Sequence, residues 1–410
     1  MSKKNKRIPE LRFPEFKNEG EWEDKTLGEV CKITNGKSNA QDHIVEGQYP
    51  LFDRSEVIKA SNEYIFDTEA VIIPGEGMRF IPKYYKGKFN LHQRAYALKD
   101  FTINGQFVYH YMLYNSTLLS QKAVQSTVLS LRLPILQNFP ILVPKAKKEQ
   151  QKIASCLSSL DEVIEAHSQK LDLLKDHKKG LMQNLFPQEG EKVPKYRFKE
   201  FEKDGEWVKK SLIDTADKKV KWSFTGGPFG SNLKASDYTS EGIRIIQLQN
   251  IGDGEFNDEY KIYTSEEKAD ELLSCNIYAG EIILSKMGDP VGRACIIPDN
   301  LKRCVMASDG IRLVVNETKY SKYFVYSLIN SKPIREAIEN KATGSTRKRI
   351  GLDELRNIEL IMPKSLSEQI KIANCISSLD KSIVAQELKI EQLKQHKKGL
   401  MQGLFPKVID

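Results

Sequence analysis

A stretch of 41 residues that occurs twice sets the strongest limit on how this chain can fold. The first copy spans Lys147 to Pro187, the second spans Leu366 to Pro406, and 25 of the 41 positions are identical. Within each copy, apolar residues recur in alternating steps of four and three. This spacing is the a/d pattern of a coiled coil, so each copy is predicted to form one long helix with a narrow apolar stripe.

The apolar stripe predicts where the two helices pack against each other. In the first helix its members are Ile153, Leu157, Leu160, Ile164, Leu171, Leu174 and Leu181. In the second helix they are Ile372, Ile376, Leu379, Ile383, Ile390, Leu393 and Leu400. Since the matching stripe lies in the same molecule at a high effective concentration, we expect an intramolecular antiparallel coiled coil rather than a homodimer. A rise of 1.5 Å per residue makes each helix about 55 Å long.

Four polar residues interrupt the stripe at matching places. They are His167 and Lys178 in the first helix, and Gln386 and Lys397 in the second. A polar residue at a seam position commonly fixes the register and orientation of paired helices. We expect these four residues to do that rather than to carry chemistry.

A shorter repeat opens each half of the chain. The sequence from Pro9 to Val30 resembles that from Pro194 to Ala216 through an arginine, two phenylalanines, a glycine, a tryptophan and a leucine in the same order. Equivalent positions are 185 residues apart here and 219 apart in the helices, so the second half is 34 residues longer between its two repeats. The chain is therefore a tandem duplication of one large unit with a variable middle.

Both variable middles mix strand patterns with helix patterns. The predicted strands are Tyr64–Phe66, Ala70–Ile73, Arg94–Leu98, Gly242–Leu248, Glu281–Ser285, Ala294–Ile297 and Gly310–Val315. The predicted helices are Gly105–Ser120, Lys322–Asn330 and Pro333–Asn340, and the run Lys86–Lys88 is predicted to be a turn.

The predicted fold class is therefore α+β. Two mixed α/β modules are separated and joined by the two long helices, with pseudo-two-fold symmetry. The predicted segments are 1–144 for the first module, 145–187 for the first helix, 188–194 for a hinge, 195–363 for the second module and 364–410 for the second helix.

The composition indicates an intracellular protein with some affinity for polyanions. The formal net charge is +8 and the pI is about 8.9, which favours nucleic acid as a partner. The six cysteines form no CxxC pair and have no histidine partners at zinc spacing, which indicates reduced thiols and no metal site. Because the chain starts without a secretory signal and has no long apolar run, we expect a cytoplasmic location and no membrane span.

None of the candidate catalytic motifs is complete. The sequence NGKS at 35–38 ends like a phosphate-binding loop, but position 31 holds cysteine where that motif requires glycine. The glycine turn at 224–230 loosely suggests a cofactor loop, yet its proline removes a backbone donor. Asp299 and Glu317 fit the loose spacing of a metal-dependent nuclease, a pattern short enough to arise by chance. The chain is therefore predicted to lack catalytic residues and metal ligands of its own.

What remains is a set of residues suited to nucleic acid, placed beside glycines in the loops of both middles. In the first middle they are Asn35, Lys37, Asn39, Arg54, Arg79, Lys83, Tyr84, Lys86, Gln93 and Arg94. In the second they are Ser231, Asn232, Lys234, Gln247, Gln249, Asn250, Lys286, Arg293, Ser345, Thr346, Arg347, Lys348 and Arg349. Arginine and lysine can pair with guanine, asparagine and glutamine with adenine, and hydroxyl groups and lysines can hold phosphates. Each module is thus predicted to carry a DNA-binding surface.

This layout resembles the specificity (S) subunit of type I restriction-modification systems, a family in which two target-recognition domains alternate with two helical regions. The resemblance covers nearly the whole chain. It rests on LPILQNFPILVP and LDELRNIELIMP before the helices, EQQKIASCLSSLD and EQIKIANCISSLD at the helix starts, and a shared HKKGLMQ near the helix ends. The sequence GPFGSNLK at 227–234 also looks like the start of such a recognition domain, whereas the first module carries TNGK at 34–37.

The resemblance implies a non-catalytic subunit that reads double-stranded DNA. In this family it assembles with two methyltransferase subunits, which bind adenosylmethionine and methylate adenine N6, and with two motor-nuclease subunits, which use ATP and magnesium to cleave unmethylated DNA. No cofactor is expected in this chain itself. Similar arms with different middles further predict a bipartite, non-palindromic target, with about 34 Å between the half-site centres and a spacer set by the helices.

Two other functions fit parts of the pattern. A self-sufficient nuclease would use Asp299 and Glu317 to hold a metal ion and would cut DNA without partners. A coiled-coil scaffold without a role on DNA would show no salt-dependent DNA binding, whereas several contacts from lysine and arginine to phosphate make binding steeply dependent on salt.

Overall fold

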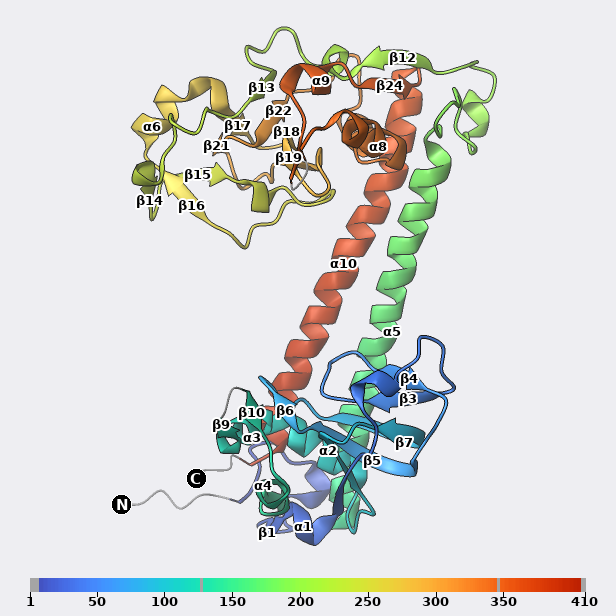
Figure 1. Ribbon diagram of the computed structural model, residues 1–410, viewed down its shortest axis with the longest axis vertical. Helices are drawn as coiled ribbons and strands as arrows, with labels where there is room; N and C mark the ends of the chain where they lie inside the picture. The colour runs from blue at the N-terminus through green and yellow to red at the C-terminus, as the bar shows by residue number, and fades with distance from the viewer. Residues whose placement is uncertain (1–6, 126–127, 345–346, 407–410) are drawn as a thin grey trace. The chain divides into compact units, whose positions relative to one another are not determined.

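The computed structural model describes residues 7–125, 128–344 and 347–406 of the chain (Figure 1). By its internal contacts the chain forms two compact units. Unit 1 comprises Met1–Lys170 and Gln386–Asp410, and unit 2 comprises Leu171–Ala385. Each unit holds one mixed α/β module, part of one long helix and part of the other. Unit 1 is therefore made of two segments that are distant in sequence, whereas unit 2 is one continuous segment.

The two repeated stretches each form one continuous helix. These are α5 (Lys147–Leu185) and α10 (Leu366–Leu404), both of 39 residues (Figure 1). Every residue predicted for the apolar seam is buried or partly buried, whereas Leu173 and Leu388 on the flanks are exposed. The a/d pattern therefore separates the inward from the outward positions of both helices.

In unit 1 the two helices run antiparallel. Lys397 Nζ on α10 lies 2.6 Å from Asp161 Oδ2 on α5, and Gln386 Nε2 donates to the backbone oxygen of His167 at 2.7 Å. A step forward along α5 therefore corresponds to a step backward along α10. These polar seam residues satisfy one another across the pair, which fits a role in setting the register.

Unit 2 repeats the same ion pair with the two helices exchanged. Here Lys178 Nζ on α5 lies 2.6 Å from Asp380 Oδ1 on α10, and Asp380 also accepts a hydrogen bond from Tyr323. Lys178 is equivalent to Lys397 in the repeat, as Asp380 is to Asp161. Antiparallel pairing places the end of one helix beside the start of the other, which explains why each unit contains parts of both.

The module of unit 1 is built on one six-stranded sheet, in the order β2-β8-β5-β7-β3-β4. Only the neighbours β3 and β7 are parallel in it. Its strands are β2 (Lys32–Asn35), β3 (Tyr49–Phe52), β4 (Lys59–Ser61), β5 (Phe66–Pro74), β7 (Lys83–Leu91) and β8 (Ala95–Lys99).

Strand β5 is buried on both faces in its second half, residues 70–74, which explains the apolar run at these positions. Val71 and Ile73 belong to a cluster that includes helix α2 (Gly105–Tyr114), whereas Ala70 and Ile72 belong to a second cluster. Successive side chains of a strand point to opposite faces, so the two clusters lie on the two sides of the sheet. A strand covered on both sides loses the usual alternation of apolar and polar residues.

Three local features of this module differ from the sequence-based expectation. The strand expected at Tyr64–Phe66 begins only at Phe66, which is the first residue of β5. The turn expected at Lys86–Lys88 is instead part of β7, where Gly87 adopts a φ of 133° opposite Thr68. Glycine adopts this φ readily and does not end the strand. The helix expected over Gly105–Ser120 is divided at Asn115, whose side chain donates to a backbone carbonyl of α2 and so competes with helix continuation.

The module of unit 2 divides its strands between two sheets. The first is antiparallel, in the order β13-β22-β18-β20, and corresponds strand by strand to β2-β8-β5-β7 of unit 1. The second has the order β14-β16-β15-β21-β17. Their bounds are β13 (Phe224–Gly226), β14 (Tyr238–Thr239), β15 (Ile243–Ile246), β16 (Ile262–Thr264), β17 (Asn276–Tyr278), β18 (Ile282–Ser285), β20 (Ala294–Ile296), β21 (Arg303–Met306) and β22 (Gly310–Leu313).

A break in one strand produces the second sheet. Strand β7 of unit 1 is continuous, whereas the corresponding stretch of unit 2 is split into β20 and β21 by the loop 297–302. Strand β20 stays in the first sheet, and β21 pairs in parallel with β15 in the second. The additional length of this half lies mainly between β15 and β18, in β16, helix α6 (Glu266–Glu271) and β17. Helices α7 (Lys322–Ile329) and α8 (Lys332–Lys341) follow β22.

A buried carboxylate ties the opening repeat of unit 1 to the start of α5. Glu149 is fully buried and accepts hydrogen bonds from Arg12 Nε and Nη2, both at 2.7 Å, and from Trp22 Nε1 at 3.3 Å. The next residue, Gln150, accepts a hydrogen bond at 3.2 Å from the backbone N–H of Asn104, which caps α2. The start of the long helix therefore holds both the opening segment and a helix of the module.

The same anchor recurs in unit 2 at the start of α10. Glu368 accepts hydrogen bonds from Arg197 at 2.8 and 2.9 Å and from Trp207 at 3.1 Å. Gln369 accepts a hydrogen bond at 3.0 Å from the backbone N–H of Ser321, which caps α7. Both opening segments also form a two-stranded sheet with the segment that leads into the long helix. These pairs are β1 (Glu23–Thr26) with β11 (Pro140–Val143), and β12 (Val208–Ser211) with β24 (Glu359–Met362).

Removing the charge of one anchor should destabilise mainly its own unit. Glu149→Gln leaves the buried Arg12 guanidinium without its counter-charge, a change that commonly costs about 3–5 kcal/mol. Denaturant titration followed by hydrogen exchange should show unit 1 opening earlier in this variant, and unit 2 opening earlier in Glu368→Gln. Glu162→Gln, at an exposed position of α5, is the matched control. Equal stability of the Glu149→Gln and Glu162→Gln chains would contradict the anchor.

Candidate nucleic-acid interface

Two loops of unit 1 that are distant in sequence are held together by a close backbone contact. The loop after β2 begins at Gly36, where a Cβ atom would stand 1.9 Å from the carbonyl oxygen of Leu91. Only glycine permits this approach. The backbone N–H groups of Lys37 and Ser38 both donate to the same oxygen at 3.1 Å. The loop therefore lies against the turn that joins β7 to β8.

Four of the residues predicted to bind DNA meet at this contact. Asn35 Nδ2 donates to the backbone carbonyl of Gln93 at 3.2 Å, and Gln93 Nε2 donates to Asn39 Oδ1 at 2.9 Å. All three residues are exposed, and so is Lys37. The contact gathers amide groups, which can pair with base edges, beside a cation that can hold a phosphate.

A carboxylate orients two arginines next to the same turn. Arg54 Nη1 lies 3.0 Å and Arg94 Nη1 lies 2.9 Å from Oε2 of Glu76, in β6 (Glu76–Gly77). Each guanidinium bonds Glu76 through one nitrogen and remains about half exposed, so its other donors are accessible. His92 supports the turn, because its Nδ1 accepts from the Arg94 N–H at 3.1 Å. Burial lowers the pKa of His92, which keeps the imidazole neutral.

Unit 2 builds the corresponding loop on a second glycine. A Cβ atom on Gly227 would stand 1.9 Å from the carbonyl oxygen of Ala307, in the turn that joins β21 to β22. Gly227 thus allows a close approach of two backbone segments in the second module, as Gly36 does in the first. The exposed residues of this loop that were predicted to bind DNA are Ser231, Asn232 and Lys234.

Both loops end in the same short helical turn but present different side chains. Asp42 closes the first loop by accepting from the Asn39 N–H at 2.6 Å, and Asp237 closes the second by accepting from the Lys234 N–H at 2.7 Å. Asn39 and Lys234 therefore occupy equivalent, exposed places. The first offers an amide donor and acceptor, whereas the second offers only a cation. The two loops therefore share the same short helical turn but present different side chains.

A run of three basic residues in unit 2, at positions 347–349, lies beside the glycine loop of this unit. Strand β23 (Lys348–Arg349) pairs antiparallel with β19 (Met287–Gly288), and Arg349 Nη2 lies 3.0 Å from Asp309 Oδ1. Asp309 belongs to the turn against which Gly227 packs, so the loop and the basic strand meet at one place. The exposed members of the run are Arg347, Lys348 and Arg349, while Ser345 and Thr346 lie outside the described residues.

The carboxylates that orient the arginines were not among the residues predicted from the sequence. Glu76 holds Arg54 and Arg94, and Asp309 holds Arg349, with 20% and 18% of the two acidic side chains exposed. An acidic residue among basic residues can be explained from the sequence as a group that balances charge, because the sequence does not show its hydrogen-bond partners. The one signal in the sequence is the glycine on each side of Glu76.

Asn250 is a structural residue rather than a DNA contact, which corrects its assignment. Its side chain is fully buried: Oδ1 accepts from the Gln247 N–H at 2.9 Å, and Nδ2 donates to the carbonyls of Asn257 and Tyr260 at 2.8 and 2.9 Å. Every strong hydrogen-bonding direction of the amide is directed at the backbone. No polar atom is left for a base.

Two residues of β7 are likewise engaged within the module. Lys83 Nζ donates to the backbone carbonyl of Ser55 at 2.6 Å, and Tyr84 OH donates to Glu69 Oε1 at 2.8 Å. Burial and then the bond to Glu69 raise the pKa of Tyr84, so its hydroxyl stays protonated. Both side chains are partly buried, whereas Lys86 on the same strand is exposed. Lys86 is therefore the accessible member of this group.

The other predicted residues lie around the loops without joining them. Arg79 and Gln249 are exposed, and Gln247, Lys286 and Arg293 are partly buried. In the described part of the chain, no side-chain hydrogen bond connects these five residues to the loop residues described above.

The described residues offer no geometry for a metal-dependent nuclease. Within 7–125, 128–344 and 347–406, no group of three or more His, Cys, Asp or Glu side chains is placed to hold a metal ion. Asp299 is exposed in the loop between β20 and β21, and Glu317 pairs with Lys322 at 3.2 Å.

None of the helices in the described part of the chain is both long and apolar enough to cross a membrane.

The fold defines a duplicated protein in which each mixed α/β module is anchored on antiparallel helices and presents a polar loop on a glycine contact. A family model described as the type I restriction modification DNA specificity domain matches residues 19–176 and 241–395. The chain belongs to this family, which confirms the resemblance seen in the sequence.

Individual relatives agree with this assignment. The chain is 23% identical over 417 residues to the type I restriction enzyme MjaVIII specificity subunit of Methanocaldococcus jannaschii, covering 96% of this chain and 93% of that protein. Its fold is similar to that of the type I restriction-modification S subunit from M. genitalium, with a TM-score of 0.65, 16% identity and coverage of 98% and 100%. A second structure, described as showing complex assembly and conformational transition of the type I R-M system, gives a TM-score of 0.53 at 13% identity, covering 95% and 98%.

Asn250→Ala should destabilise unit 2 without changing which DNA is read. The truncation leaves one N–H and two carbonyl groups without their partner, and each such loss costs about 1–3 kcal/mol. Gln249→Ala, at the exposed neighbouring position, should leave the unfolding temperature unchanged and weaken DNA binding. Thermal unfolding and DNA binding of both variants check this pair. A stable Asn250→Ala chain with an altered sequence preference would contradict the structural role.

Proposed function

We propose that this chain is the sequence-reading and assembly subunit of a type I restriction-modification complex, and that each module reads one half of a bipartite, non-palindromic DNA target. Membership of the specificity family supports this. The observation that carries the proposal is the pair of loops at Gly36 and Gly227. Both glycines approach a backbone carbonyl too closely for a Cβ atom and both loops close in a short helical turn, whereas the exposed side chains at equivalent places differ, as with Asn39 and Lys234. A repeated frame suits two half-sites, and different side chains make the half-sites different.

The exposed cations around the loops suit the phosphate backbone. In unit 1, Arg54 and Arg94 keep free guanidinium donors while Glu76 fixes their position. In unit 2, Asp309 does the same for Arg349. An oriented arginine loses less conformational freedom on binding than a mobile one, which favours specific contacts over diffuse attraction. The net charge of +8 adds long-range attraction to DNA.

The chemistry belongs, in this proposal, to partner subunits. Two methyltransferase subunits would bind adenosylmethionine and methylate adenine N6 after turning the base out of the duplex. Two motor-nuclease subunits would use ATP and magnesium to cleave unmethylated DNA. This chain would supply sequence reading and attachment in the cytoplasm, where these partners meet DNA. The absence of a catalytic motif from the sequence and the names of the relatives support this division of roles.

We further propose that the long helices set the length of the unread spacer. Each has 39 residues, which corresponds to about 58 Å of helix at a rise of 1.5 Å per residue. Each helix contributes to both units. In this proposal, a change in helix length would change the spacing of the two half-sites and leave both readers unchanged.

Exchanging the second module alone should change one half of the target. The exchange replaces residues 218–361 by the corresponding part of another family member, and the chain is co-expressed with its methyltransferase partner. Sequencing that detects methylated adenines should then show one half-site and the spacer unchanged, and the other half-site replaced. A target altered in both halves, or in neither, would contradict modular reading.

Inserting seven residues at equivalent places in both helices should lengthen the spacer only. Seven residues preserve the heptad and add about 10 Å of helix, or roughly three base pairs. The methylation map should show both half-sites unchanged at the longer spacing. A three-residue insertion in one helix, which breaks the seam, is the control and should abolish methylation. Methylation of the original target at full rate by the seven-residue variant would rule out the helices as the determinant of spacing.

A further inference from the structure

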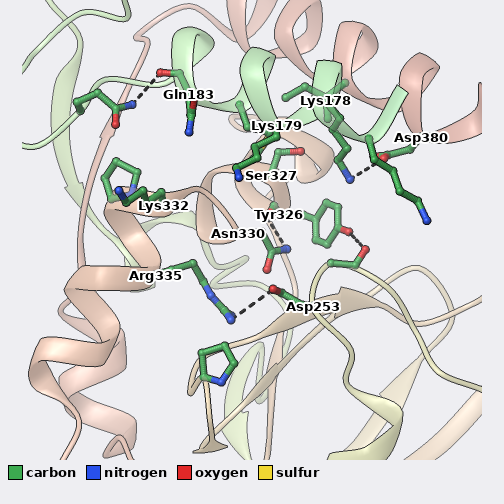
Figure 2. Close-up of a pocket in the computed structure, with 17 residues that line it drawn as sticks. Lys178, Lys179, Gln183, Asp253, Tyr326, Ser327, Asn330, Lys332, Arg335 and Asp380 are labelled. Carbon is green, nitrogen blue, oxygen red and sulfur yellow. Dashed lines mark hydrogen bonds and ion pairs between the residues drawn. The ribbon is translucent and has the colours of Figure 1, made fainter. Parts of the chain in front are cut away.

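Unit 2 contains a cavity of about 510 Å³ between its parts of the long helices and its module (Figure 2). Its walls come from α5, α10, α7 and α8 and from the loop at Asp253. The volume falls in the range of small-molecule sites. Met182, Pro333 and Ile376 give it an apolar side. The lining contains none of the residues proposed to contact DNA.

The polar side of the cavity carries an excess of positive charge. Its cationic residues are Lys175, Lys178, Lys179, Lys332 and Arg335, and its acidic residues are Asp253 and Asp380. Both carboxylates are already engaged, Asp380 by Lys178 at 2.6 Å and Asp253 by Arg335 at 3.3 Å (Figure 2). Lys178 and Arg335 face these carboxylates and Lys332 lies 3.7 Å from Glu336, so Lys179 adds a positive charge beyond these ion pairs and favours an anion in the cavity.

Two buried polar groups of the lining lack a hydrogen-bond partner among the described residues. Ser327 is 2% exposed, and its Oγ has none. Nη1 and Nη2 of Arg335 are buried and make no hydrogen bond, although Nη2 lies near the Asp253 carboxylate. Burial lowers the pKa of Arg335. Unsatisfied buried donors are rare in folded proteins, and here they line a space large enough for a ligand.

The start of α8 adds to the attraction for anions. Lys332, Pro333 and Arg335 lie in the first turn of this ten-residue helix, and the Ser331 side chain does not cap it. A helix N-terminus carries partial positive charge on its unbonded N–H groups.

Unit 1 has a larger side chain at the corresponding place. Helices α2 and α7 share the sequence Phe-Val-Tyr, which is followed by His110 in α2 and by Ser327 in α7. His110 is fully buried, and its Nε2 lies 3.0 Å from Ser158 Oγ. Burial lowers the pKa of His110 to about 3, so it stays neutral. His110 Nδ1 also lies 4.0 Å from Asp161, whose repeat equivalent Asp380 lines the cavity of unit 2, where the smaller Ser327 stands at the place of the histidine.

We propose that unit 2 binds a small phosphate-bearing molecule of about nucleotide size in this cavity, with Arg335, Lys179 and Ser327 holding the phosphate. A phosphate supplies both the negative charge and the acceptor oxygens that these donors lack. The apolar wall would face the body of the molecule. Because the cavity is lined by both long helices and by the module, the bound molecule would stabilise the module on its helices.

The test uses the full chain with AMP, and with inorganic phosphate as a smaller probe. Titration calorimetry should detect binding of AMP, and thermal unfolding should show a higher unfolding temperature in its presence. Arg335→Gln removes a charged donor and should weaken AMP binding about tenfold or more. Ser327→His, which places the residue of unit 1 in unit 2, should put an imidazole where the phosphate would lie and strongly weaken AMP binding. Lys389→Gln, exposed on α10 outside the cavity, should bind AMP as the unchanged chain does.

Circular dichroism and the unfolding temperature without ligand establish that each variant is folded. Failure of the unchanged chain to bind either AMP or phosphate would overturn the proposal, as would unchanged AMP affinity in folded Arg335→Gln and Ser327→His chains. If neither probe binds but both variants lower DNA affinity and its salt dependence, the phosphate that the cavity meets is that of the DNA backbone, and the small-molecule site is refuted.

Discussion

The antiparallel pairing of the two long helices within one chain is the constraint on which the rest of the structure depends. The stripes alone would allow several registers, and the polar contacts select one in each unit. Lys397 meets Asp161 in unit 1, and Lys178 meets Asp380 in unit 2, so the same ion pair occurs twice with the helices exchanged. A shifted register would leave these charges partly buried and unpaired, which is costly. The ion pairs therefore specify the pairing.

In each unit, a buried carboxylate joins the repeated opening segment to the repeated long helix, and the variable middle lies between these two repeats in the sequence. Glu149 and Glu368 hold the opening segments on the helices through the same arginine and tryptophan bonds. Beyond that anchor the modules differ: the main strands form one six-stranded sheet in unit 1 but a four-stranded and a five-stranded sheet in unit 2, and the glycine loops carry different side chains. In the described part of the chain, the hydrogen bonds of the two anchors involve none of the loop residues, so a glycine loop can change while its anchor stays constant.

The periodic and duplicated features could be predicted from the sequence, whereas features made by distant contacts could not. The long helices, their seam and the repeated layout follow from local spacing. The strand at Gly87 was expected to be a turn, because glycine between two lysines looks like one until β5 pairs with it. The burial of Asn250 depends on carbonyls that folding brings to it from another loop. The cavity depends on Ser327 and Arg335, which lie on different helices and carry no common sequence signal.

Pairing of the helices within one chain is tested most directly by a cross-link between equivalent seam positions. His167 and Gln386 are in contact in unit 1, so cysteines at both places, with Cys156 and Cys375 changed to serine, should form a disulfide on oxidation. Chains labelled with ¹⁴N and with ¹⁵N are mixed, unfolded and refolded together before oxidation. Mass spectrometry of the linked peptides should find both halves carrying the same isotope. Linked peptides that combine the two isotopes would show that the helices pair between chains, and would contradict the account.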